Sequence, residues 1–249
     1  MGRRNLLVTG ASAGIGAATA RLAGRRGYNV AIHYNSDRAG AERVAGDVEA
    51  AGGQAVLIQG NVAQPEAVSR IFAEFDAALP GLDAFVNNAG IVDMKTRVDE
   101  ISADRLINMV NINLVGAFLA AKEAVLRMST AHGGTGGAIV NLSSAAAKLG
   151  AAGQYVDYAA TKGAIEVLNL GLSQEVANEG VRVNAIRPGI IETDIHAKGG
   201  LPNRAAEMAP MVPMKRSGSA EEVAEAILWL LSDASSYVTG TVMDVTGGR

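Results

Sequence analysis

The chain of 249 residues contains no cysteine. This absence excludes a disulfide scaffold, a thiolate metal site and a cysteine nucleophile. The three histidines, His33, His132 and His196, are far apart and show no metal-ligand spacing, so we expect no metal centre. Aromatic residues are few, at 4%, but 49% of the chain is hydrophobic. A chain of this length and composition can bury a core without covalent or metal crosslinks.

The chain also lacks an excess of charge of either sign. Its 22 basic and 25 acidic residues give a formal net charge of −3, which does not indicate binding to nucleic acid or to an anionic membrane. The first apolar run, residues 6–8, is far too short for a signal-peptide core. We see no stretch of the length of a membrane span, and we therefore expect a cytoplasmic protein.

Short apolar runs alternate with longer helical stretches along the whole chain. The runs have no polar alternation, which is typical of strands buried on both faces. They are residues 6–8, 30–32, 55–58, 84–86, 138–142, 181–186 and 242–245. The helices predicted between them are 17–26, 38–51, 65–78, 104–128, 158–178 and 219–231. This alternation predicts an α/β fold of the Rossmann type, a doubly wound, seven-stranded parallel sheet with helices on both faces.

No linker or internal repeat divides the sequence, so we expect a single domain over residues 1–249. Residues 190–218 form the only long stretch without clear periodicity. A long irregular segment in a compact domain is usually functional, so this one predicts a lid or substrate-binding loop. The alternative is a surface excursion with two short helices.

A glycine-rich turn follows the first predicted strand. Gly10 permits a tight turn, Gly14 lets backbone amides approach a pyrophosphate, and Gly16 allows a helix to pack closely on the strand. In this position the glycines predict a dinucleotide site, whereas elsewhere they could merely reverse the chain. The residues of this turn that we expect to bind the cofactor are Gly10, Ser12, Ala13, Gly14, Ile15 and Gly16.

The end of the second strand bears on which cofactor is used. An acid there would bind the ribose hydroxyl of NAD, but this chain has Tyr34, which we expect to contact the cofactor in its place. Asn35, Ser36 and Arg38 could donate to a 2′-phosphate, so we expect NADP(H) to be preferred. Asp37 leaves NAD(H) as an alternative, because its carboxylate could take the role of the acid. A third reading is a solvated polar turn without cofactor contact.

Tyr158 and Lys162 begin a predicted helix at a spacing that places both side chains on one face. A nearby ammonium should lower the pKa of the tyrosine from its usual value of about 10. The pair is therefore a candidate proton donor and acceptor for a carbonyl or an alcohol. Ser143 and Ser144 end the preceding strand, and either hydroxyl could hold the substrate oxygen.

These motifs together resemble the short-chain dehydrogenase/reductase family, including its 3-oxoacyl-carrier-protein reductases and its glucose dehydrogenases. The resemblance spans the whole chain. The segments that carry it are Thr9–Gly16, Asn87–Gly90, Asn113, Ser144, Tyr158–Lys162, Arg187–Gly189 and Gly240–Gly248.

The resemblance implies roles for individual residues. Tyr158 would be the general acid/base, and Lys162 would lower its pKa and bind the nicotinamide ribose. Ser144, at the more usual spacing, would orient the substrate oxygen, and Asn113 would hold a water for proton relay. The further cofactor contacts that the resemblance implies are Asn61, Val62, Asn88, Ala89, Gly90, Pro188, Gly189, Ile191 and Thr193.

Two positions depart from the pattern of the family. Many members have an Asp-Val pair beside the adenine, where this chain has Asn61 and Val62. Many members that use NADP carry a basic residue where this chain has Ala13, which weakens the prediction of NADP(H).

The expected function is an NAD(P)-dependent oxidoreductase that transfers a hydride between the nicotinamide and a carbonyl or secondary alcohol. The alternatives are a nucleotide-sensing protein without turnover and an NAD-linked sugar or alcohol dehydrogenase. The substrate would be a small carbonyl compound or alcohol, and an acyl thioester on a carrier protein is a further option. A basic patch could receive such a carrier, and its residues would be Lys198, Arg204, Lys215 and Arg216.

The resemblance also implies a homotetramer, with a dimer as the alternative. Ala159, Ala160, Gly163 and Ala164 make one part of the predicted catalytic helix small, as close approach to a second copy would require. The same small residues could instead only seat the helix on its own sheet.

Overall fold

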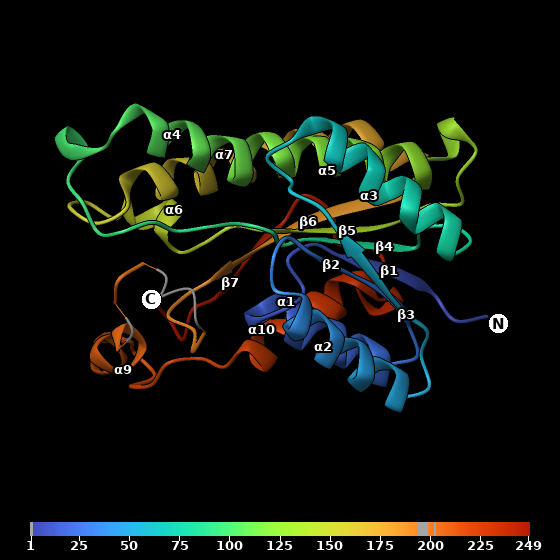
Figure 1. Cartoon of the computed structure of the whole chain (residues 1–249), viewed down its shortest axis with the longest axis horizontal. Helices are drawn as coiled ribbons and strands as arrows, with labels where there is room; N and C mark the ends of the chain where they lie inside the picture. Colours follow the sequence, from blue (N-terminus) through green and yellow to red (C-terminus); the bar gives the residue numbers. More distant parts are fainter. Residues whose placement is uncertain (1, 194–198, 202) are drawn as a thin grey trace.

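One parallel sheet runs through the molecule (Figure 1). The structure is a computed structural model that describes residues 2–193, 199–201 and 203–249, so His196 and Lys198 lie outside the described residues. The strands are β1 (Asn5–Val8), β2 (Asn29–Tyr34), β3 (Ala55–Gln59), β4 (Ala84–Asn87), β5 (Gly137–Leu142), β6 (Val181–Pro188) and β7 (Val242–Val245). Their order is β3-β2-β1-β4-β5-β6-β7, which confirms the predicted doubly wound fold.

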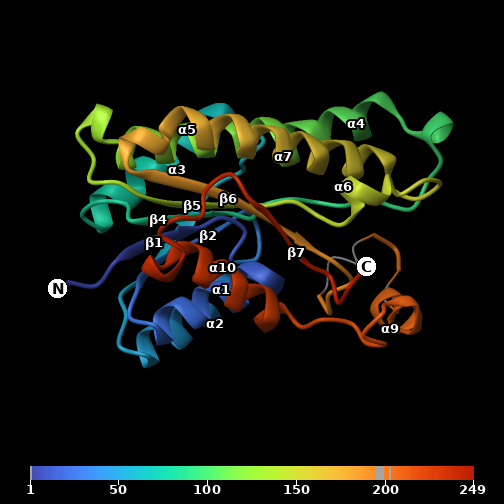
Figure 2. The ribbon, with the colours of Figure 1, turned by 180° about the vertical axis from the view of Figure 1, so that it is seen from behind.

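Helices cover both faces of the sheet, as the views from the two sides show (Figures 1 and 2). One face carries α1 (Gly14–Arg25), α2 (Arg38–Ala50) and α10 (Ala220–Leu231). The other carries α3 (Pro65–Ala78), α5 (Ala117–Met128) and α7 (Val156–Val176). Because both faces are covered, the strands need apolar side chains at successive positions rather than at alternate ones.

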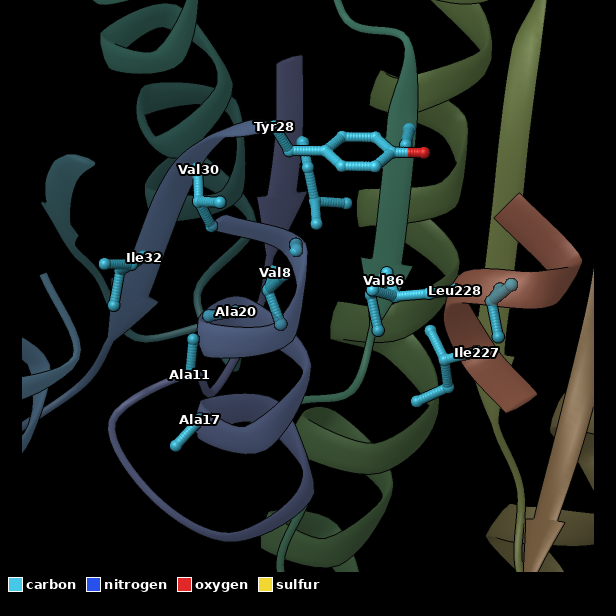
Figure 3. Packing of buried hydrophobic residues seen from close by; sticks show 14 of the residues in the cluster. Val8, Ala11, Ala17, Ala20, Tyr28, Val30, Ile32, Val86, Ile227 and Leu228 are labelled. Atoms are coloured by element: carbon cyan, nitrogen blue, oxygen red, sulfur yellow. The ribbon is translucent and has the colours of Figure 1, made fainter. Parts of the chain in front are cut away.

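The packing of β1 shows this directly. Leu6 and Val8 belong to the core under α1 and α10, whereas Leu7 belongs to the core under α3 and α5. Figure 3 shows Val8 near Ala20 of α1, with Ala17 about one turn earlier on the same helix, and all three belong to this core. These alanines keep the helix close to the sheet, and close packing of this kind holds the carboxyl ends of the strands in fixed positions.

The expectation of one regular helix over residues 104–128 is wrong in its middle. α4 (Ala103–Val110) continues through a π-helical turn, Asn111–Gly116, into α5. The wider turn inserts one residue into the helical period, which an apolar pattern does not reveal. A Cβ on Gly116 would lie 2.4 Å from the carbonyl oxygen of Val62, so the helix passes directly against that loop. π-helical turns are common at functional sites.

The same stretch, Ala103–Met128, is long and apolar enough to cross a membrane by length and composition, which corrects our reading that no stretch reaches this length. This is weak evidence, because a core helix passes the same test. In the structure the stretch packs against α3 and α7, and Arg127 pairs with Asp76 of α3 at 2.7 Å. A cytoplasmic location stays a prediction.

Two other boundaries differ from the expected ones. α1 begins at Gly14 rather than at residue 17, so Gly14 and Gly16 of the glycine-rich segment lie in the first helical turn of α1. α7 begins at Val156, two residues before Tyr158. The capping box of Ser219 and Glu222 at the start of α10 is present as the sequence indicates.

The irregular segment after β6 is pinned at its base. Gly218 donates its backbone N–H to the carbonyl of Ile190 at 2.9 Å, and Glu192 donates to the carbonyl of Gly218 at 2.9 Å. Between these points the described residues include α9 (Arg204–Met208) and a 3-10 turn, Ala209–Met211. The C-terminus, α9 and α6 (Ala146–Leu149) lie at the same end of the molecule (Figure 1). The described part of the segment thus contains α9 and the short 3-10 helix, and it also borders the cleft described next.

Candidate active site

The cleft lies at the carboxyl ends of the strands and consists of two adjoining cavities. One, of about 420 Å³, is bordered by the ends of β5 and β6 and the start of α7. The other, of about 340 Å³, surrounds the glycine-rich turn. The residues that line both are Ile15, Asn88, Gly90, Val92 and Thr193. Since they share these walls, the cavities form one continuous cleft at the place where doubly wound folds bind ligands.

The glycine-rich turn presents its backbone to the smaller cavity. Gly10 has φ +65° and Gly14 has φ +54°, values that side chains other than hydrogen disfavour. A Cβ on Gly16 would lie 2.4 Å from the carbonyl oxygen of Gly10. Ala13, the N-cap of α1, makes no side-chain cap hydrogen bond. The first amides of α1 and its dipole are therefore available to an anion.

His33, which we noted only as an isolated histidine, supports this turn from β2. Its Nδ1 accepts a hydrogen bond from the Gly10 N–H at 3.2 Å, and its Nε2 lies 3.0 Å from the carbonyl oxygen of Gly60. A carbonyl can only accept, so Nε2 carries the proton. Burial lowers the pKa of His33 to about 4. The available sequence signal was a polar residue within an apolar strand.

We expect His33 to make the fold less stable in mild acid. The pKa of His33 is about 4 in the folded chain and about 6.5 in the unfolded one, so only the unfolded chain binds a proton between these values. Stability is therefore full above pH 6.5 and falls by about 3 kcal/mol as the pH drops to 4. Urea unfolding across this range should show a flatter profile for His33→Gln. The control His132→Gln, at an exposed histidine, should show the same decrease in unfolding free energy with falling pH as the wild type. If His33→Gln also shows this decrease unchanged, His33 is not its cause.

The structure brings only part of the turn after β2 to the cavity. Asn35, Ser36 and Asp37 line it. Tyr34 does not, because its side chain is packed in the core and only 3% exposed. Arg38 also lies outside the lining, where its Nε donates to Glu42 at 2.8 Å.

Asp37 has a structural partner in addition to its place at the cavity. Its Oδ1 accepts from the N–H of Gly40 at 2.9 Å, so it caps α2. The second carboxylate oxygen faces no described hydrogen-bond donor, so both the helix cap and a contact in the cavity are compatible with its position.

The loops after β3 and β4 complete the smaller cavity. Asn61, Val62, Asn88, Ala89 and Gly90 all line it, as predicted for cofactor contacts. The side chain of Asn61 accepts from the N–H of Ala63 at 3.0 Å, so its amide oxygen already forms a turn. Asn88 donates to the carbonyl oxygens of Thr9 at 2.8 Å and Gly10 at 3.1 Å, which braces the glycine-rich turn.

Tyr158, Lys162 and Ser144 meet on the wall of the larger cavity, which Pro188, Gly189 and Ile191 also line. The ammonium of Lys162 lies 5.7 Å from the ring centre of Tyr158 and donates to the carbonyl oxygen of Leu142 at 2.7 Å.

Burial controls the pKa of both titratable groups. It raises the pKa of Tyr158 above its usual value of 10, and the hydrogen bond with Ser144 opposes this only in part. It also lowers the pKa of Lys162 to about 8. The expectation that the ammonium lowers the pKa of the tyrosine is therefore wrong for this structure. The reason is that the loss of water around the phenolate outweighs the hydrogen bond with Ser144, while the Lys162 ammonium donates to the carbonyl oxygen of Leu142.

The two candidate serines have different surroundings. Ser143 is 3% exposed, and its hydroxyl donates to the carboxylate of Glu166 at 2.6 Å. Glu166 also pairs with Arg187 at 2.5 Å, so Ser143 belongs to an ionic network beneath the cavity. Ser144 instead shares a hydrogen bond with Tyr158. These contacts favour Ser144 as the hydroxyl that meets a substrate.

Asn113 lies in the π-helical turn and is 1% exposed. It accepts from the N–H of Ile91 at 2.8 Å and donates to the carbonyl of Ile91 at 2.9 Å. A Cβ on Gly90 would lie 3.2 Å from the Asn113 oxygen and 3.5 Å from the Lys162 ammonium. The structure therefore brings Asn113 and Lys162 together behind Gly90.

A buried ion pair next to Tyr158 was missed in the sequence. Asp157, with a side chain 1% exposed, binds Arg105 of α4 at 2.8 Å and 3.2 Å. Arg105 also donates to the carbonyl oxygen of Met94 at 2.6 Å, and Asp157 accepts from the N–H of Tyr158 at 2.9 Å. The pair ties α4 and the loop after β4 to the first turn of α7. The only sequence signal was an acid directly before the tyrosine.

No group of three His, Cys, Asp or Glu side chains within the described ranges could hold a metal ion.

The fold, the glycine-rich turn and the Tyr158–Lys162 pair define a dehydrogenase or reductase of the Rossmann type. Residues 10–249 match the family model described as enoyl-(acyl carrier protein) reductase. With the relatives below, this match shows that the chain belongs to the short-chain dehydrogenase/reductase family, as the resemblance implied.

Curated relatives span nearly the whole chain. It is 48% identical over 243 residues to the uncharacterized oxidoreductase YgfF of Escherichia coli (strain K12), with 98% of both chains covered. It is 38% identical to 3beta-hydroxysteroid dehydrogenase 1 of Eggerthella lenta, with 98% of this chain and 93% of that one covered. It is 35% identical to the 3-oxoacyl-[acyl-carrier-protein] reductase FabG of Staphylococcus aureus (strain Mu50), with 98% and 97% covered.

Solved structures of related proteins have the same fold over nearly the whole chain. A short-chain type dehydrogenase/reductase from Mycobacterium marinum superimposes with a TM-score of 0.92 at 31% identity, with 99% of this chain and 95% of that one covered. A blue fluorescent protein from a metagenomic library, in complex with NADPH, gives 0.90 at 29% identity, with 99% and 98% covered. A 3-ketoacyl-(acyl-carrier-protein) reductase from Brucella melitensis, complexed with NADH, gives 0.91 at 28% identity, with 100% and 98% covered.

Proposed function

We propose that the chain is an NAD(P)(H)-dependent oxidoreductase that interconverts a carbonyl compound and a secondary alcohol. The observation that carries this proposal is the continuity of the cleft. Tyr158, Lys162 and Ser144 line one end of it, and the glycine-rich turn lines the other. A nicotinamide cofactor, when bound, supplies or accepts the hydride.

The residues present fit such a cofactor. A side chain at Gly16 would collide with the backbone of Gly10, and the amides at the start of α1 have no side-chain cap. These amides would hold the pyrophosphate. Val62 and Ala89 would border the adenosine half, and Pro188 and Thr193 the nicotinamide half.

Each polar residue of the larger cavity would have its own role in moving the proton or orienting the substrate. In the reductive direction the hydroxyl of Tyr158 would give its proton to the carbonyl oxygen of the substrate, which becomes the alcohol oxygen. Ser144 donates a hydrogen bond to the same oxygen and orients it. Lys162 and Asn113, behind Gly90, would return a proton to the phenolate through water.

The raised pKa of Tyr158 favours one direction at neutral pH. Burial keeps the phenol protonated well above pH 7, so it is ready to act as an acid in carbonyl reduction. Alcohol oxidation needs the phenolate, whose population rises with pH. We therefore propose carbonyl reduction as the favoured reaction near neutrality.

We propose that NADP(H) is preferred over NAD(H). No acid stands at the end of β2, where Tyr34 is buried. Asn35 and Ser36 border the cavity, and Arg38 follows them in the sequence, where its guanidinium binds Glu42 and also interacts with Tyr34. NAD(H) remains the alternative through Asp37, which also borders the cavity.

Paired fluorescence titrations with NADPH and NADH at fixed salt test the function and the preference together. We expect NADPH to bind at least about tenfold more tightly, and Arg38→Gln to reduce this ratio. Arg43→Gln, an exposed arginine on the same helix, should leave the ratio unchanged. Equal or tighter binding of NADH would assign the ribose contact to Asp37 instead. Binding of neither cofactor would reject the proposed function.

We further propose that the exposed face of α4, α5 and α7 contacts a second copy of the chain, as part of a homotetramer. Its apolar residues include Ile107, Phe118 and Val167, each more than half exposed. Gly163 and Gly171 of α7 would accept a Cβ without contacting anything within 4 Å, so packing within the chain does not require these glycines. Glycine weakens a helix, so close approach of another copy is the better reason for them. Sedimentation velocity measures the assembly directly.

A further inference from the structure

The larger cavity has a notable charge balance. Its described lining includes three cations, Lys162, Arg204 and Arg249, and no aspartate or glutamate. The rest of the wall is mostly apolar, with Val92, Leu149 and several alanines. Lys162 is already assigned to the proton chemistry next to Tyr158. The other two cations have no part in that chemistry, so they need a separate explanation.

Arg204 is held in place without being neutralised. Its guanidinium lies 5.3 Å from the ring centre of Tyr155, a side chain that is only 6% exposed. Within the described part of the chain the side chain of Arg204 forms no ion pair, and its one contact is with this ring, while the backbone N–H donates to the carbonyl oxygen of Leu201. Arg216, on the same irregular segment, pairs with Glu222 at 2.6 Å.

The position of Arg204 relates it to the reacting end of the cavity. Tyr155 is the N-cap of α7, and Tyr158 follows three residues later on the same helix. Arg204 and Tyr158 thus border one cavity of about 420 Å³ from two different elements, α9 and α7. A cavity of this size encloses a small organic molecule. One molecule could therefore contact both groups.

We propose that Arg204 receives a carboxylate of the substrate. The substrate class is then an oxo or hydroxy acid in which an apolar body separates the reacting carbonyl from the carboxylate. The inference rests on the proposed function and specifies its substrate. A guanidinium on a ring and next to apolar walls gains a charge-assisted hydrogen bond from a carboxylate, and the scarcity of water strengthens it.

The experiment compares keto acids with uncharged analogues of the same size. Methyl ketones that carry a terminal carboxylate after two to six methylene groups are each paired with the corresponding primary amide. Rates with NADPH and NADH give kcat/KM for every pair. For the wild type we expect the acid to exceed the amide by about 10- to 100-fold at the best chain length. The series finds the separation between the two groups without assuming it.

Variants of Arg204 assign the preference to that side chain. Arg204→Gln should abolish the preference for the acid and leave reduction of the amides within about twofold, whereas Arg204→Lys should retain part of it. Arg70→Gln removes an exposed arginine of α3, far from the cavity lining, and should change neither rate. This control separates a local contact from the loss of one positive charge.

The outcomes separate this inference from the function on which it rests. If amides and acids react equally well, or if Arg204→Gln keeps the preference, the inference is overturned and the oxidoreductase assignment stands. If a wider panel of neutral ketones also gives no turnover although NADPH binds, the proposed function fails and the inference fails with it.

Discussion

Tyr158→Phe is expected to lower kcat for carbonyl reduction by about 100- to 10,000-fold, the usual contribution of a positioned general acid. The substitution removes the hydroxyl that shares a hydrogen bond with Ser144 and leaves the aromatic ring facing Lys162. The cavity wall keeps its shape, so affinity for the cofactor and the free energy of unfolding should change little. Stopped-flow measurement of hydride transfer checks the loss of rate, and titration with the cofactor checks that its affinity is unchanged.

The reason for such a selective loss is that the phenol of Tyr158 is the acidic hydroxyl that shares a hydrogen bond with Ser144 and has the Lys162 ammonium near its ring. Ser144 can still bind the carbonyl oxygen in the variant, but a serine hydroxyl is a far weaker acid than a phenol. Lys162 lies 5.7 Å from the ring centre of Tyr158 and donates to the carbonyl oxygen of Leu142, so its ammonium already has a hydrogen-bond partner. Reduction would then depend on a proton from water.

The pH profile gives an independent readout of the same group. Because burial raises the pKa of Tyr158 above its usual value, the phenol stays protonated from pH 6 to 9, and alcohol oxidation should rise throughout this range. A fall in wild-type reduction within this range would report Lys162, whose pKa is about 8. Tyr158→Phe should remove the rise in oxidation. Tyr237→Phe, at a fully exposed tyrosine, should behave like the wild type. A Tyr158→Phe enzyme that keeps more than about a tenth of kcat would reject the acid role, and a wild type that binds NADPH without any turnover would favour a nucleotide sensor.

The strands could be predicted because each is apolar at successive positions. Leu6, Leu7 and Val8 face two separate cores on opposite sides of the sheet, so no residue of β1 is free to be polar. The π-helical turn at Asn111–Gly116 could not be predicted in the same way. Gly116, at its end, packs against Val62, and such a contact between residues far apart in the sequence leaves no local pattern.

In the candidate site, too, local features could be predicted from the sequence and contacts between distant residues could not. The glycine-rich turn and the Tyr158–Lys162 pair could be predicted because their residues lie within one turn or one helix. The support of Gly10 by His33 joins two strands, and the contact of Arg105 with Asp157 joins two helices. Such pairs leave no spacing pattern. The direction of the Tyr158 pKa depends on how deeply the whole cavity is buried, which spacing also does not reveal.

Arg105→Met is expected to lower the free energy of unfolding by about 3–5 kcal/mol, the usual cost of leaving one partner of a buried ion pair alone. Asp157 is then a carboxylate with a side chain 1% exposed, and the N–H of Tyr158 is its one remaining described partner. The carbonyl of Met94 also loses a hydrogen bond. Urea unfolding at a fixed protein concentration measures the change. Arg97→Met, in an exposed pair with Asp99, should cost less than about 1 kcal/mol.

The double variant Arg105→Met with Asp157→Leu separates the ion pair from the packing around it. Replacing both charges with apolar side chains leaves no unpaired carboxylate, so much of the lost stability should return. Catalysis should not return with it, because the backbone of Tyr158 has lost the acceptor that fixes the first turn of α7. Asp157→Asn keeps an acceptor oxygen and should retain more of kcat than the double variant. If the double variant regains both stability and kcat, the pair stabilises the fold and has no part in positioning Tyr158.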